Sequence, residues 1–256
     1  RLYVATARDG VRLYDEGRNR ATGTLAAEAL AATWRAFTVP STISGNHVLA
    51  LSQDQAGYLW LLTDVGLQQW DPASPTAPLL FHDENSRYPI SSITTLAADP
   101  QRGIWVGGQN AGYFDGFTWT NFATTDGLVD RNVRTLAVDG DRRTWFGTEN
   151  GLSIWNGDSF FNLTPADGLP SKTINTFFVD DNNVWIGTEH GLLRFAESRL
   201  QIFTAATTHL PSDRITALAR DEDGALLIGT DQGLARFLNT IISVVPEFEG
   251  QPITAV

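Results

Sequence analysis

The segment VWIGTEHGLLRF, residues 184 to 195, decides the fold. An apolar run that contains Trp185 is followed by the polar triplet TEH, and after Gly191 a second apolar run ends at Phe195. Short apolar runs on either side of a polar turn with glycine are typical of two antiparallel strands joined in a hairpin. The next question is whether this hairpin is unique or repeated.

The same pattern recurs along the whole chain. Six copies align on the aromatic or large apolar residue of the first strand of each hairpin, and these anchors are Tyr3, Trp60, Trp105, Trp145, Trp185 and Leu227. The anchors are separated by 57, 45, 40, 40 and 42 residues. A repeat of roughly 40 residues that contains only short strands is typical of the blades of a β-propeller.

Each copy contains four apolar segments, which predict four strands. The first segment of the fifth copy, INTFFVD at residues 174–180, is apolar on both faces, as expected for an inner strand covered by neighbouring sheets. Five such segments end in an aspartate that begins a tight turn, and these residues are Asp54, Asp99, Asp139, Asp180 and Asp221. Trp145 and Trp185 are expected to lie wedged between blades. Outside the insert at 15–34, whose Ala/Leu-rich half favours a short helix, no segment has a helical period.

The two ends of the sequence predict one shared blade. ITAV, residues 253–256, reads as the start of another inner strand, whereas the sequence begins at Arg1 directly on a second strand. Pairing the two would close the ring and remove open sheet edges. We therefore predict an all-β fold: a single domain, residues 1–256, forming a six-bladed β-propeller of four-stranded antiparallel blades, closed by a blade shared between the termini. A start at Arg1, within a repeat and without Met, also favours a processed product or a fragment.

These repeats resemble the two-component regulator propeller repeat, whose consensus is approximately GLPS..I..L..D..G.LWIGT..GL.RF. Residues 167–195, DGLPSKTINTFFVDDNNVWIGTEHGLLRF, match it almost throughout, and residues 126–155 and 210–237 match nearly as well. The copies near Trp60 and Trp105 are looser, and the first copy is looser still. Propellers of that family commonly form the extracytoplasmic sensing part of membrane-anchored histidine kinases. The resemblance implies a sensor propeller in an extracytoplasmic location, although the sequence contains no kinase or receiver segment.

Composition narrows the range of partners. The net charge is −11 and the isoelectric point is near 4.7, so phosphate backbones and anionic membrane surfaces would be repelled. No apolar run is long enough to span a bilayer, so we expect neither nucleic-acid binding nor direct membrane insertion. The chain has no cysteine, which excludes disulfides and thiolate metal sites.

Ligand-binding residues are expected in the loops on one face of the propeller, at the mouth of the central channel. The turns between the second and third strands supply the candidates, which are Arg8, Asp9, Asp64, Gln109, Asn110, Glu149, Asn150, Glu189, His190, Asp231 and Gln232. The acidic members suit an amine, sugar hydroxyls or a divalent cation. The alternative, which we favour for the acidic members, is that these residues only satisfy the chemistry of tight turns.

The sequence does not favour catalysis. The four histidines, His47, His82, His190 and His209, lie in four different copies, and no HExxH, GxSxG or P-loop signature is present. We predict no catalytic residue, no metal site and no required cofactor, with a divalent cation at the acidic mouth left as an alternative.

Three functions stay open. The leading one is a non-enzymatic recognition propeller that binds a small polar ligand or glycan at the channel mouth. It would couple to a partner protein or to domains of its parent chain. The second is a structural module for protein–protein interaction in a larger surface assembly, and the least favoured is a propeller lyase or hydrolase.

Overall fold

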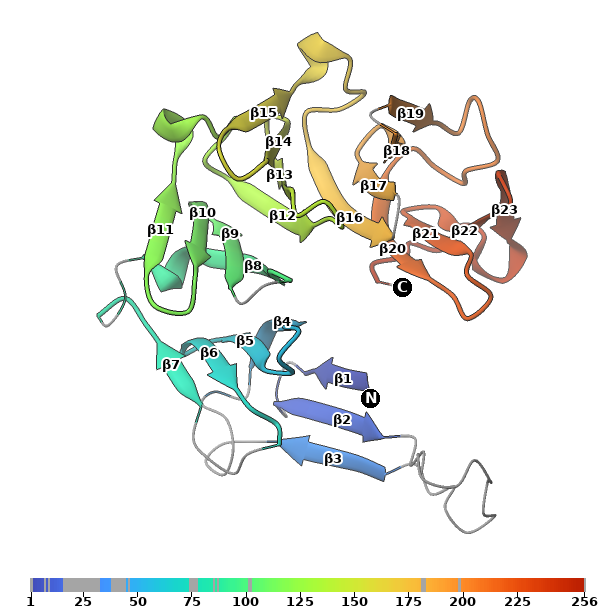
Figure 1. The fold of residues 1–256 in the computed structure, drawn as a ribbon. Coiled ribbons are helices and arrows are strands. Elements are labelled where there is room, and N and C mark those ends of the chain that lie inside the picture. The colour runs from blue at the N-terminus through green and yellow to red at the C-terminus, as the bar shows by residue number, and fades with distance from the viewer. Residues whose placement is uncertain are drawn as a thin grey trace. The chain divides into compact units, whose positions relative to one another are not determined.

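The computed structural model describes residues 2–6, 8, 10–15, 33–37, 45, 47–73, 78–84, 86, 88–100, 103–180, 183–197 and 199–255. These residues form β-strands and four short 3-10 helices, which confirms the all-β prediction (Figure 1). The 3-10 helices are Ile90–Ser92, Thr124–Asp126, Pro165–Asp167 and Pro246–Phe248. No helix among the described residues is both long and apolar enough to cross a membrane. The helix expected in the 15–34 insert falls on residues 16–32, outside the described part.

The chain divides into two compact units, and unit 1 comprises residues 1–104 and 115–119. It contains a three-stranded sheet, β1-β2-β3, and a four-stranded sheet, β4-β5-β6-β7. Their strands are β1 (Leu2–Ala5), β2 (Val11–Asp15), β3 (Thr33–Phe37), β4 (Val48–Gln53), β5 (Leu59–Thr63), β6 (Gly66–Trp70) and β7 (Leu79–Phe81).

Unit 2 comprises residues 105–114 and 120–256. Its three complete sheets are β12-β13-β14-β15, β16-β17-β18-β19 and β20-β21-β22-β23. Their strands are β12 (Val133–Val138), β13 (Thr144–Thr148), β14 (Leu152–Trp155), β15 (Phe160–Leu163), β16 (Ile174–Asp180), β17 (Asn183–Thr188), β18 (Gly191–Ala196), β19 (Arg199–Phe203), β20 (Ile215–Arg220), β21 (Leu226–Thr230), β22 (Gly233–Leu238) and β23 (Ile241–Val245). A further sheet has residues in both units and contains β8 (Ile93–Ala98), β9 (Ile104–Gly108), β10 (Asn110–Phe114) and β11 (Trp119–Phe122).

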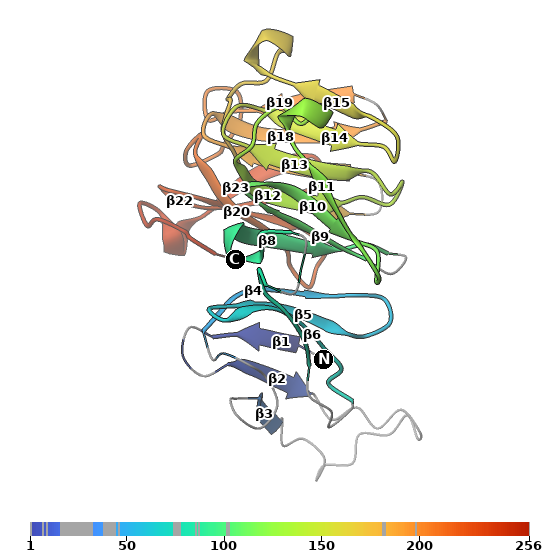
Figure 2. The ribbon, with the colours of Figure 1, turned by 90° about the vertical axis from the view of Figure 1, so that its left-hand side faces the viewer.

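The sheets follow the order predicted from the repeats. In unit 2 the first strands of successive sheets, β12, β16 and β20, are in contact and follow one another in Figure 1, and Figure 2 shows the β12-β13-β14-β15 sheet from the side. The chain is thus an all-β propeller of antiparallel four-stranded sheets. Residues 251–255 are not assigned to a strand, and none of the described residues pairs with them in a sheet, so the strand expected from Ile253 is not seen there.

A hydrogen bond between the aspartate after the first strand and the tryptophan of the second strand recurs in the repeats. Nε1 of Trp145 donates to Oδ2 of Asp139 at 2.8 Å. Trp60 and Asp54 form the same bond at 3.1 Å, as do Trp185 and Asp180 at 3.3 Å. Such an acceptor stabilises a buried indole N–H, because an unpaired polar group is costly in the core. The repeat of Trp105 departs from this pattern, since its buried Nε1 has no hydrogen-bond partner among the described residues.

The same carboxylate also fixes the turn that follows the first strand. Asp139 accepts the backbone N–H of Arg143 at 2.8 Å, and the backbone N–H of Asp139 donates to the carbonyl of Arg143 at 3.0 Å. Asp54 holds Tyr58 through an equivalent pair of bonds, each of 3.0 Å. One aspartate therefore joins the turn, the first strand and the tryptophan.

The sixth copy has Leu227 instead of tryptophan and satisfies its aspartate in another way. Nε of Arg236 donates to Oδ2 of Asp221 at 2.6 Å, while the backbone N–H of Ala225 donates to Oδ1 at 2.8 Å. The Arg236 hydrogen bond holds the pKa of Asp221 below its usual value. A guanidinium from the third strand thus replaces the missing indole.

The tryptophans connect one sheet to the next, as predicted. Trp145 is fully buried and meets the ring of Phe195 edge-on, with 5.0 Å between ring centroids. Trp185 meets Phe237 of the following sheet in the same way at 4.9 Å. Each of these indoles therefore contributes both to its own sheet and to the contact between sheets.

Trp145 offers a direct test of this packing. Replacing it with alanine should lower the free energy of unfolding by about 3 to 5 kcal/mol, because a large buried side chain is lost. Trp145→Phe keeps most of the packing but removes the donor to Asp139, so it should cost about 1 to 2 kcal/mol. Phe117, which is 87 % exposed, is the control, and Phe117→Ala should change stability by less than about 0.5 kcal/mol. Urea denaturation measures all three, and a loss below about 1 kcal/mol for Trp145→Ala would contradict the packing described.

Candidate functional site

The turns between second and third strands are built around a buried threonine. In the β17–β18 turn the Thr188 hydroxyl donates to the carbonyl of Gly191 at 2.8 Å and accepts the backbone N–H of His190 at 3.0 Å. Thr63, Thr148 and Thr230 make the same two bonds in their own turns. The threonine therefore closes the turn internally and is not available to a ligand.

The glycine that ends each of these turns is also structural. Gly191 has a φ of 125°, a backbone conformation that residues other than glycine rarely adopt. A Cβ atom at this position would lie 2.8 Å from the carbonyl oxygen of Phe203 in the outer strand. Threonine and glycine together satisfy the backbone, so the residues between them are free to vary.

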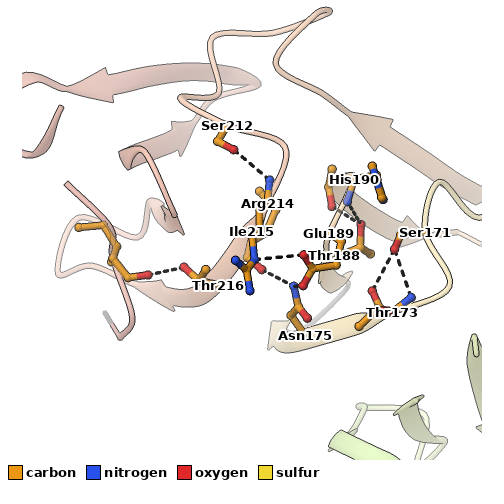
Figure 3. Close-up of polar contacts among 12 residues, drawn as sticks. Ser171, Thr173, Asn175, Thr188, Glu189, His190, Ser212, Arg214, Ile215 and Thr216 are labelled. Carbon is orange, nitrogen blue, oxygen red and sulfur yellow. Dashed lines mark hydrogen bonds and ion pairs between the residues drawn. The ribbon is translucent and has the colours of Figure 1, made fainter. Parts of the chain in front are cut away.

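Glu189 lies at the centre of a polar network (Figure 3). Its Oε1 accepts a hydrogen bond from Nδ2 of Asn175 at 2.9 Å, and its Oε2 lies 3.1 Å from Nε of Arg214. Asn175 also donates to the carbonyl of Ile215 at 3.0 Å. Because Asn175 lies in β16 and Arg214 precedes β20, Glu189 joins two adjacent sheets. Its charge is already compensated within the protein.

The second network surrounds the loop Asp130–Arg134 and collects four of the candidate residues. Gln109 forms an isolated β-bridge with Asn132, and the backbone N–H of Asn110 donates to Arg131 at 2.6 Å. Glu149 accepts from Asn132 at 3.3 Å and from Arg134 at 3.4 Å. The Asn150 side chain donates to Asp130. Gln109, Asn110, Glu149 and Asn150 are thus held by this one loop.

The turn between β21 and β22 contains Asp231 and Gln232. Oδ1 of Asp231 is buried and has no hydrogen-bond partner among the described residues. The Gln232 side chain is exposed, while its carbonyl accepts the backbone N–H of Gly250 at 2.9 Å. His190 is exposed too, and its imidazole has no hydrogen-bond partner in the described part of the chain. Among the candidates of unit 2, His190 and Gln232 are therefore the ones whose side chains are accessible and have no partner in the described residues.

Unit 1 contains the other candidates, Arg8, Asp9 and Asp64. Arg8 is exposed, and Asp9 lies outside the described residues. Asp64 lines a hollow of about 630 Å³. The rest of its described wall comes from β4 to β6 and from the connection to β8: Leu49, Leu62, Thr63, Val65, Gly66, His82, Asp83, Glu84, Ile90, Ser91 and Ile93.

Sequence reasoning missed Asn175, which meets Glu189, and the strand irregularity that places it. Arg134, Asn175 and Thr216 each occupy the second position of a first strand, where the register with the second strand shifts. Such a β-bulge leaves one residue unpaired and redirects its side chain. No signal in a single strand reveals this shift, because it depends on how two strands pair.

The arrangement suits hydrogen bonding more than metal chemistry. Among the described residues, no group of three or more His, Asp or Glu side chains is placed to hold a metal ion. Two of the acidic candidates, Glu149 and Glu189, already face an arginine. A polar ligand at these turns would therefore meet the side-chain amides and the imidazole, while the charges of Glu149 and Glu189 are largely compensated by arginine.

Comparison with known proteins agrees with the repeat structure. Residues 168–190 and 209–232 match the family model described as Two component regulator propeller. The chain carries two-component regulator propeller repeats. These two matches contain the turns of Glu189 and Asp231, so the candidate site of unit 2 lies partly within the repeats that define the family. Comparison with curated proteins gives no match.

Solved structures share the fold of these propeller repeats. The extracellular domain of the hybrid two component system BT4673 from B. thetaiotaomicron has a TM-score of 0.70 and 20 % identity, covering 99 % of this chain and 33 % of that one. The corresponding domain of BT3049 from the same organism has a TM-score of 0.66 and 19 % identity over 84 % of this chain and 32 % of that one. The propeller thus spans about a third of each sensor structure.

An enzyme has the same fold. Virginiamycin B lyase from Staphylococcus aureus has a TM-score of 0.63 and 14 % identity, covering 88 % of this chain and 75 % of that one. At these identities the likeness concerns architecture, and a shared propeller does not by itself specify a function.

Thr188 tests the structural role of the turns. Thr188→Val keeps the shape of the side chain but leaves the N–H of His190 and the carbonyl of Gly191 without their buried partner, so unfolding should become easier by about 1 to 3 kcal/mol. Thr125→Val, at an exposed threonine without a hydrogen-bond partner in the described residues, should have an effect below about 0.5 kcal/mol. Equal stability of the two variants in urea denaturation would show that the hydroxyl does not hold the turn.

Proposed function

We propose that this chain is a non-enzymatic recognition propeller that acts as a sensor. It binds a small polar ligand or glycan through the turns between second and third strands, and it passes occupancy to a partner protein or to further domains of its parent chain. The chain is a single domain located outside the cytoplasm, in the periplasm, at the cell surface or secreted. Ligand binding requires no cofactor.

One observation carries this proposal. Thr188 and Thr230, with the glycines that follow them, satisfy the backbone of their turns, so the fold makes no demand on the side chains in between. Those positions nevertheless present His190 and Gln232, which are exposed, polar and different from each other. Different hydrogen-bonding groups on a shared frame are what an asymmetric polar ligand needs.

The neighbouring networks would hold such a site in place. Glu189 is fixed from two sheets by Asn175 and Arg214, and the Asp130–Arg134 loop is fixed by Glu149. Binding groups on a rigid support lose less conformational freedom when a ligand arrives. The likeness to extracellular sensor domains supports the sensing role and the location.

We also propose that the propeller is a closed ring of six blades, in which residues 253–256 supply the missing inner strand beside β1. Ile253 supports this, because a Cβ on Gly229 would lie 2.7 Å from its Cγ2. Ile215 lies at the same distance from a Cβ on Gly187. Ile215 begins the next inner strand, so Ile253 occupies the equivalent position.

Backbone hydrogen bonds support the same assignment. The N–H of Ile253 donates to the carbonyl of Thr230 at 2.8 Å. In unit 1 the N–H of Val48, the first residue of β4, donates to Thr6 of the preceding turn at 3.1 Å. Ile253 therefore carries the contacts that elsewhere mark the beginning of an inner strand.

Ligand binding can be measured by thermal unfolding against a panel of oligosaccharides, amino acids, polyamines and divalent cations. A ligand present at about 100 times its Kd adds about 2.7 kcal/mol, which raises the Tm of a domain of this size by about 5 to 10 °C. The double variant His190→Ala with Gln232→Ala should lose most of that shift, because both side chains are exposed and leave the turns intact. Gln201→Ala, on the exposed outer strand β19, should keep it. An unchanged shift in the double variant would remove these turns from the site.

Ring closure can be tested with two introduced cysteines, since the chain has none. In the last sheet Ile215 pairs with Thr230, and Ala217 pairs with Gly229. In the same register, the proposed shared blade would pair Ile253 with Thr6, and Ala255 with Ala5. Ala5→Cys with Ala255→Cys should therefore form an intramolecular disulfide on mild oxidation, because paired strands bring Cα atoms within about 6 Å.

Ala206, which is exposed in unit 2, provides the control for this cross-link. Ala5→Cys with Ala206→Cys should keep two free thiols, as counted by alkylation and mass measurement of the folded protein. Closure in the proposed register is contradicted if both pairs oxidise equally or if neither pair does.

A further inference from the structure

The hollow in unit 1 is apolar where the corresponding surface of the other repeats is polar. Leu49 occupies the second position of its first strand, where the other copies have Thr94, Arg134, Asn175 and Thr216. Val65 occupies the second turn position, where the others have Asn110, Asn150, His190 and Gln232. Leu49 is 56 % exposed and Val65 is 46 % exposed, and both line the same hollow. The two aliphatic exceptions thus coincide in one repeat and at one place.

Backbone geometry presents these side chains to solvent. The register between β4 and β5 shifts between Val48 and Ala50, so Leu49 is the unpaired residue of a bulge, as Asn175 is in its own sheet. Val65 lies in the tight turn closed by the Thr63 hydroxyl, which accepts its backbone N–H at 3.3 Å. Neither residue is needed to fill the core.

A third difference between this repeat and the others accounts for the hollow. Leu62 stands where Gly147, Gly187 and Gly229 stand in other copies. At Gly147 a Cβ would lie only 2.6 Å from the next inner strand's Ile174, so the glycine permits close approach. The Leu62 side chain forbids that approach, and it lines the hollow together with Ile93, the first residue of the next inner strand.

Negative charge surrounds this apolar floor. Asp64 and Glu84 are exposed and make no side-chain hydrogen bond or ion pair among the described residues. Asp83 is ordered by Ser91, whose backbone N–H and hydroxyl donate to its two oxygens at 2.9 and 2.6 Å. None of the described lining residues is lysine or arginine. The hollow therefore combines exposed aliphatic surface with the carboxylates of Asp64 and Glu84, which no described residue pairs, while His82 lies beside Asp83 in the same lining.

The wall that carries Asp83 and Glu84 is anchored in the interior of unit 1. Tyr88, which follows in the same connection, is 1 % exposed and stacks on Trp119 with 5.2 Å between ring centroids. Burial raises the pKa of the Tyr88 phenol well above its ordinary value, so the side chain stays neutral. A partner would consequently meet a wall that is held at both ends, by Tyr88 and by the Asp83–Ser91 pair.

We propose that this hollow is a docking groove for an extended segment of a partner protein in which lysine or arginine side chains alternate with aliphatic ones. Aliphatic side chains would cover Leu49 and Val65, while the cationic groups would reach Asp64 and Glu84. Charge complementarity favours a basic segment, because the groove is acidic and the chain carries a net charge of −11. A chain segment fits better than a small amine, because Leu49 and Val65 are about half exposed and a small molecule would leave much of them in water. This goes beyond the proposed sensing role, because it concerns how the propeller engages a partner.

The test uses fluorescently labelled peptides about eight residues long, one alternating lysine with leucine and one alternating lysine with serine. The lysine–leucine peptide should bind the whole chain, as measured by fluorescence anisotropy, and the lysine–serine peptide should bind at least about tenfold more weakly. The variant Leu49→Thr with Val65→Asn introduces the residues that other repeats carry at these positions, and it should weaken binding of the lysine–leucine peptide about tenfold. Asp64→Asn with Glu84→Gln should weaken it as well and should reduce its dependence on salt.

His190→Asn is the matched control, because it changes the position equivalent to Val65 in another repeat. It should leave peptide affinity unchanged even if it abolishes small-ligand binding, which separates this inference from the proposed function. Thermal unfolding of Leu49→Thr with Val65→Asn should match that of the parent chain, showing that the fold is intact. The groove is ruled out as the docking site if this variant binds as tightly as the parent, if lysine–serine binds as tightly as lysine–leucine, or if neither peptide binds by about 1 mM.

Discussion

The hydrogen bond from the tryptophan indole to the aspartate carboxylate is the interaction on which the repeats of Trp60, Trp145 and Trp185 depend. It joins residues six positions apart in Trp60 and Trp145, and five apart in Trp185, across the turn between first and second strands. The carboxylate is fixed by the turn, and the indoles of Trp145 and Trp185 also contact an aromatic residue of the next sheet. One bond thus connects a local reversal of the chain to the packing between layers. Where tryptophan is missing, Arg236 supplies the donor and the aspartate keeps its role.

In the turns between second and third strands, some residues hold the backbone and others are free to vary. Threonine and glycine hold the backbone, whereas the positions between them and the bulged second residue of the first strand carry whatever side chain each repeat provides. In two repeats these positions build networks around Glu149 and Glu189 that join neighbouring elements. In the repeat of Leu49 and Val65 they instead expose aliphatic surface. The same frame therefore carries polar side chains in one unit and an apolar hollow in the other.

Much of this architecture could be predicted from the sequence, because apolar runs and glycine turns depend on local chemistry. The hairpin around Gly191, the aspartate turns and the burial of Trp145 and Trp185 all follow from residues close together in the chain. The pairing of Glu189 with Arg214 could not be predicted, since it joins side chains of successive sheets and depends on their spacing. The bulges were missed because a register shift is a property of two strands, and neither sequence alone reveals it. The sequence alone shows that Leu49 and Val65 are aliphatic where other repeats are polar. Only the structure shows that both side chains line one hollow.

The contact between glycine and the next repeat's isoleucine also bears on how such a chain can be rearranged. Three glycines leave room for an isoleucine methyl group at less than 3 Å from where a Cβ would be, so these repeats fit any neighbour that begins with the same residue. At this contact, such repeats could exchange places by recombination or protein engineering without a steric clash. The repeat that carries Leu62 could not, because moved elsewhere it would hold the following strand away. At this contact a single side chain distinguishes that repeat from three others, and a duplicated or shuffled propeller would have to accommodate it.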